Sequence, residues 1–153
     1  MLMRLAIVLA ALPIALIINA ESDTLAPLGI VAGLTVITVL MPASAAPALL
    51  IGYSALAMAF ADGHPLRLGV LLMIPLLHLV HVTSALAAIV PVKTKIEPAA
   101  LKSAVRRFAI VQAISFLVAA FAAFIPSGPN IGLTELLGLG ALTVFIAVVA
   151  LRI

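Results

Sequence analysis

The sequence predicts an all-α protein, a polytopic bundle of about six transmembrane helices forming a single domain over residues 1–153. Of these 153 residues, 66% are apolar and 8% are charged, whereas soluble domains contain about 45–50% apolar and about 25% charged residues. The apolar residues also occur in runs, and about 20 consecutive apolar residues are enough to cross a bilayer. These two observations exclude both a soluble globule and a disordered chain.

The first predicted span covers residues 5–20, which follow Arg4 and end before Glu21. A basic residue followed by an apolar run is also typical of a secretory signal peptide. Ile18, however, is large for the third position before a cleavage site. We therefore expect a retained signal-anchor helix, and a cleaved signal is the alternative.

The next apolar run, residues 25–61, is too long for one span. Its 37 residues would form a helix of about 55 Å, whereas the hydrocarbon core is about 30 Å thick. Pro42 and Pro47 interrupt the run, because each lacks a backbone donor and disfavours helix at the residue before it. We predict two short spans, 25–41 and 46–61, with a single bent helix as the alternative.

Three more spans are predicted at 68–90, 108–125 and 131–151, and a basic loop at 92–107 precedes the fifth span. The loop contains five of the eight basic residues, namely Lys93, Lys95, Lys102, Arg106 and Arg107. Pro98 fits the first turn of a helix that extends the fifth span into this loop. These basic residues either determine the topology alone or also attract anionic lipid headgroups.

The basic residues also predict the orientation. Basic residues near the ends of spans remain cytoplasmic, so the loop 92–107 should lie inside. With six spans, both termini are then cytoplasmic, and Arg67 is the only basic residue outside. The five-span alternative, in which 25–61 is one bent helix, places the N-terminus outside.

Two histidines are the most costly side chains expected inside a span. His78 and His81 are three residues apart in the fourth span, so they project from a similar face of the helix. They are either neutral side chains bonded to threonines or to carbonyls freed by Pro75, or part of a path for protons or a polar substrate, or ligands of a metal or haem. We expect no metal and no cofactor, because no Cys, Asp or Glu lies at that depth.

Other polar and small residues are candidates for contacts between helices. Glu135 lies one turn into the last span, where either the helix dipole stabilises its carboxylate or the carboxylate couples to an ion or proton. Gln112 and Ser115 should bond between helices. Gly29 and Gly33 form a GxxxG pattern, and Ser115, Ala119 and Ala123 recur every four residues. Such small residues allow backbones to approach closely, either inside the protein or against a partner.

The sequence contains no catalytic constellation. It has no cysteine, which excludes thiol chemistry and disulfides, and its few dispersed basic residues argue against nucleic acid as a partner. We expect no enzyme, but an accessory, assembly or stabilising subunit of a larger membrane complex in the bacterial cytoplasmic membrane. Its partners would be the lipid bilayer and other membrane subunits. One alternative is a small transporter or channel component with a polar path around His78 and His81. The other is an intramembrane enzyme acting on lipid, which would need a clustered acid, base and nucleophile.

Overall fold

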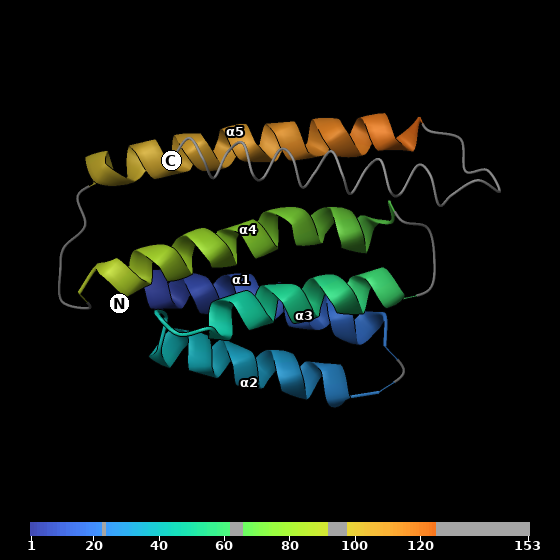
Figure 1. The fold of residues 1–153 in the computed structure, drawn as a ribbon, viewed down its shortest axis with the longest axis horizontal. Helices are drawn as coiled ribbons and strands as arrows, with labels where there is room; N and C mark the ends of the chain where they lie inside the picture. The colour runs from blue at the N-terminus through green and yellow to red at the C-terminus, as the bar shows by residue number, and fades with distance from the viewer. Residues whose placement is uncertain (23, 62–65, 92–97, 125–153) are drawn as a thin grey trace. The chain divides into compact units, whose positions relative to one another are not determined.

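The computed structural model describes residues 1–22, 24–61, 66–91 and 98–124. The regular structure in this part of the chain is helical (Figure 1). The helices are α1 (Leu2–Ala20), α2 (Ala26–Leu40), α3 (Ala46–Phe60), α4 (Leu68–Ile89) and α5 (Pro98–Ala123). The predicted all-α class is confirmed for these residues, and the predicted last span, 131–151, lies outside them.

Three of the described helices are long and apolar enough to cross a bilayer. They are Leu2–Ala20, Leu68–Ile89 and the Leu101–Phe121 part of α5, with 19, 22 and 21 residues. They indicate an integral membrane protein. Helices α2 and α3 have 15 residues each, which corresponds to about 22 Å and is shorter than the hydrocarbon core.

The apolar run 25–61 forms two helices with a tight turn between them. Each helix has a proline in its first turn, where the missing backbone donor does no harm. In the turn, the Ser44 amide donates to the Met41 carbonyl at 3.0 Å, and the Ser44 hydroxyl accepts from the Ala46 amide at 3.2 Å. Helices α2 and α3 run antiparallel and pack against each other (Figure 1), so the run is not one bent helix.

Helix α1 lies at the centre of the packing and contacts α2, α3 and α4. One face of α1 is buried, and its residues recur every three or four positions: Ile7, Ala10, Ala11, Ile14 and Ile18. Val31 of α2, Leu50 of α3 and Val80 of α4 are also completely buried. The small alanines let neighbouring helices approach α1 closely, while the larger side chains fill the remaining space.

The chain divides into two compact units, Met1–Ala119 and Ala120–Ile153. The first unit contains α1–α4 and most of α5. The structure describes only residues 120–124 of the second, where α5 ends. Helix α5 begins at Pro98, as predicted for a helical extension of the fifth span into the basic loop.

Candidate functional site

The polar site inside the helices joins α4 to α5 through His78 and Gln112. His78 lies ten residues into α4, about 15 Å from its start. Its ring Nδ1 is 2.7 Å from the side-chain Nε2 of Gln112, and its ring stacks on Phe108 with centroids 4.7 Å apart. An amide nitrogen can only donate, so Nδ1 accepts and the neutral ring carries its proton on Nε2.

The partner of His78 is therefore a side chain of another helix. The sequence suggested threonines or the carbonyls near Pro75 as partners, and it suggested Gln112 only as a bond between helices. Gln112 is 9% exposed, so its side-chain amide lies in apolar surroundings. The bond to the ring nitrogen of His78 gives the amide nitrogen a partner there. This bond connects residues 34 positions apart, which no local pattern could predict.

The neighbouring polar residues do not extend this pair into a path. His81 is exposed on α4. The hydroxyl of Thr83 donates to the Leu79 carbonyl at 2.6 Å, and that of Ser84 donates to the Val80 carbonyl. Both hydroxyls are thus used by the carbonyls of their own helix, a common arrangement in apolar surroundings.

Three buried polar atoms have no hydrogen-bond partner among the described residues: Thr38 Oγ1, Ser54 Oγ and Gln112 Oε1. A buried polar group without a partner is destabilising by about 1–3 kcal/mol. The described residues also contain no group of three or more His, Asp or Glu side chains that could hold a metal ion. Chemically, His78 and Gln112 form a hydrogen bond between α4 and α5 at this site.

A second polar cluster, which the sequence did not predict, joins three helix ends around Arg67. Arg67 Nε donates to Glu21 Oε1 at 3.1 Å, and its Nη2 donates to the Met58 carbonyl at 3.1 Å. Only 16% of the Arg67 side chain and 27% of the Glu21 side chain are exposed, so water screens this ion pair less than a pair on an open surface. We call this side of α1–α4 the Arg67 end.

The Arg67 cluster stabilises the start of α4 and the end of α3. Arg67 precedes the first residue of α4, where a positive charge is unfavourable next to the helix dipole, and the Glu21 carboxylate offsets that charge. Met58 lies in the last turn of α3, where carbonyls lack partners within the helix. One feature of the sequence could have indicated this ion pair: in the predicted topology, Arg67 is the one basic residue on the outer side, where Glu21 also lies.

The glycines of the GxxxG pattern lie on an exposed face of α2. A Cβ atom built on Gly29 or Gly33 would have nothing within 4 Å among the described residues. Side chains instead pack closely against Gly69 of α4, where a Cβ would lie 3.0 Å from Glu21 Oε1 and 3.3 Å from Ile17 Cγ2. Gly29 and Gly33 therefore do not pack closely against any other helix in the described part of the chain.

The remaining candidate residues are on α5 or outside the described residues. Lys102, Arg106 and Arg107 are exposed, and Ser115 and Ala119 are partly buried. Ala123 is the last residue of α5. Lys93, Lys95 and Glu135 lie outside the described residues.

No protein-family model matches the chain, and no curated protein and no solved structure matches it either.

Proposed function

We propose that this protein is an accessory, assembly or stabilising subunit of a larger membrane protein complex, located in the bacterial cytoplasmic membrane. The observation that carries the proposal is the small number of buried residues in α5 within the described part of the chain. In the apolar stretch of Leu101–Phe121, 6% of the residues are buried, compared with 39% in Leu2–Ala20. A long apolar helix of which the described chain covers so few residues offers an interface to another membrane subunit.

The exposed side chains of α5 also support a docking role. They include Ile110, Ile114, Leu117 and Val118, which recur every three or four residues and therefore share one face of the helix. Gln112 is buried and contacts His78 of α4, so it is not part of that exposed face.

The alternative, a transporter or channel component, rests on the His78–Gln112 bond midway along α4. A path would require further polar groups in line with this pair. Thr83 and Ser84 instead bond to carbonyls of α4. We therefore favour the subunit role.

Crosslinking in native membranes tests the proposal. A photoreactive residue placed at Leu117 or Val118 of α5 should crosslink the tagged protein to a different membrane protein that also co-purifies in detergent. Leu12 and Leu16 of α1 are the matched control positions, because they are apolar and each is 59% exposed, and they should give no such product. Isolation of the protein alone, or crosslinks only to a second copy of this chain, would overturn the proposal.

We also propose the six-span topology with both termini in the cytoplasm. The alternating directions of α1–α4 (Figure 1) and the pairing of Arg67 with Glu21 at one end support it. Reporters fused after Arg152 or between Lys95 and Lys102 should then read the cytoplasm, as should a marker at Ser44. Reporters after Gly63 or Gly128 should read the outside. If the Gly63 and Lys95 reporters read the same side, the six-span topology is wrong.

A further inference from the structure

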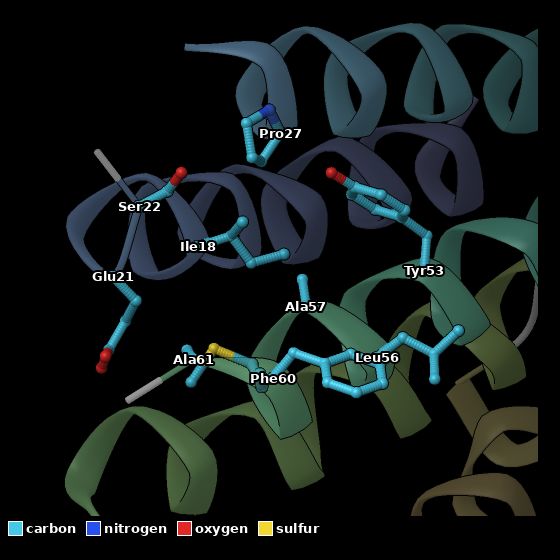
Figure 2. A pocket seen from close by; sticks show the side chains of 10 residues that line it. Ile18, Glu21, Ser22, Pro27, Tyr53, Leu56, Ala57, Phe60 and Ala61 are labelled. Carbon is cyan, nitrogen blue, oxygen red and sulfur yellow. The ribbon is translucent and has the colours of Figure 1, made fainter. Parts of the chain in front are cut away.

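A pocket opens between α1, α2 and α3 at the Arg67 end, and its volume is about 440 Å³. Figure 2 shows Pro27 of α2 on one side of the pocket, Ile18 of α1 behind it, and Tyr53 and Leu56 of α3 opposite. The volume lies within the range of small-molecule pockets, about 300–1,000 Å³. Most of the lining side chains are apolar, so the pocket suits an apolar ligand.

The volume restricts what could fill the pocket. A helix is about 10 Å across, so about 440 Å³ would hold only about one helical turn. A partner helix therefore cannot be the occupant. A flexible hydrocarbon chain can follow the space between the small Ala57 and the larger Leu56 and Phe60, which are 57% and 85% exposed.

The polar atoms near the pocket point to an uncharged contact with the ligand. The Glu21 carboxylate is paired with Arg67 and points away from the side where Ser22 and Pro27 lie (Figure 2). The Ser22 hydroxyl bonds to the backbone of Thr24. The Tyr53 hydroxyl, which points from α3 toward α1 and α2 (Figure 2), has no hydrogen bond among the described residues and can bond to a ligand.

The pocket lies where α1 and α3 end and α2 begins. In a membrane protein, helix ends lie near the lipid headgroups. Tyr53 is midway along α3, about 10 Å from the end of that helix, so the pocket extends from the helix ends toward the interior of the bilayer. We propose that this pocket binds one acyl chain of a membrane phospholipid, which enters where α1 and α3 end and reaches Tyr53. This site is independent of the subunit role and requires only that the protein is in a bilayer.

Tyr53 makes the proposal directly measurable. The chain contains one Tyr and no Trp, so its intrinsic fluorescence reports mainly on the pocket. We would titrate the full-length protein in detergent micelles with phosphatidylcholine carrying brominated acyl chains, which quench a fluorophore on contact. Quenching should saturate at about one lipid per chain, and unbrominated phosphatidylcholine should reverse it.

Substitutions inside and outside the pocket provide the matched comparison. Ala57→Phe fills the pocket and should weaken lipid binding about tenfold, which corresponds to about 1.4 kcal/mol. Ala59→Phe adds the same ring to an exposed position of α3 that does not line the pocket, and it should bind lipid like the unmodified protein. If Ala57→Phe does not fold, Ala61→Phe fills the pocket from its other end and should have the same effect.

Two results would overturn the proposal. Quenching that rises in proportion to brominated lipid without saturating, and equally in Ala57→Phe and Ala59→Phe, would mean contact with bulk lipid only. Saturation with brominated phosphatidylglycerol but not with brominated phosphatidylcholine would assign binding to headgroup charge rather than to the acyl chain.

Discussion

Helices α1 and α5 are both long and apolar, but their surroundings differ. Helix α1 contacts three other helices and buries a continuous face that includes Ile7 and Ile14. Helix α5 is connected to α4 by the contacts of Phe108 and Gln112 with His78, and few of its residues are buried within the described part of the chain. Hydropathy thus shows that both helices suit a membrane, but it does not show which of them forms the core and which offers a surface to lipid or protein.

The largest expected effect tests this contrast directly. Ile14 of α1 is 0% exposed and Ile114 of α5 is 43% exposed. Ile14→Ala should lower the free energy of unfolding by about 2–5 kcal/mol because it leaves a cavity, and Ile114→Ala should lower it by about 0.5 kcal/mol or less. Unfolding of the full chain in mixed micelles by added SDS measures both. Equal losses would show that α5 is as well packed as α1.

The contact between α4 and α5 provides the next test. His78→Leu removes the bond to Gln112 and should lower stability by about 0.6–1.7 kcal/mol. His78→Lys should be worse, by about 2.5–3.5 kcal/mol, because it places a charge at this depth without an acidic partner among the described residues. The SDS titration measures the difference. If Lys is tolerated as well as Leu, water reaches this position, and the transporter alternative gains support.

Replacing a glycine at a packed position and one at an open position should give a smaller difference in stability. Gly69→Val places side-chain atoms against Glu21 and Ile17, and such overpacking should lower stability by about 1–3 kcal/mol. Gly29→Val meets nothing within 4 Å among the described residues, so isolated protein should retain its stability. If Gly29→Val is as destabilising in the isolated protein as Gly69→Val, then the face of α2 is covered. If the isolated Gly29→Val variant is stable but no longer co-purifies with its partners from membranes, the exposed face of α2 is part of the interface.

The smallest expected effect is a gain in stability within α1–α4. Ser54 is fully buried and its hydroxyl has no partner among the described residues, so Ser54→Ala should raise stability by up to about 1 kcal/mol. Thr35→Val is the control, because the Thr35 hydroxyl donates to the Val31 carbonyl at 2.7 Å. Thermal unfolding in detergent compares the two variants. A loss of stability in Ser54→Ala would mean that the hydroxyl has a partner after all.

The boundaries of several described helices follow from local sequence patterns. Pro42 and Pro47 divide the run 25–61 into α2 and α3, and Pro98 marks the start of α5. These boundaries are predictable because a proline acts on its own backbone and on the residue before it. The apolar composition likewise predicts a membrane protein, since the hydrophobicity of a helix is a property of that helix alone.

Which surfaces of the helices contact one another is visible in the folded chain and not in its local patterns. The fold connects Glu21 to Arg67 and His78 to Gln112, pairs that are 46 and 34 residues apart. It also places close packing of side chains against a glycine at Gly69, whereas the glycines of the GxxxG pattern of α2 have no such neighbours among the described residues. Apolar side chains are equally compatible with lipid and with another helix, so helix packing depends on shape and on a few polar contacts. Those contacts form between segments distant in the chain, and local sequence patterns carry no information about them.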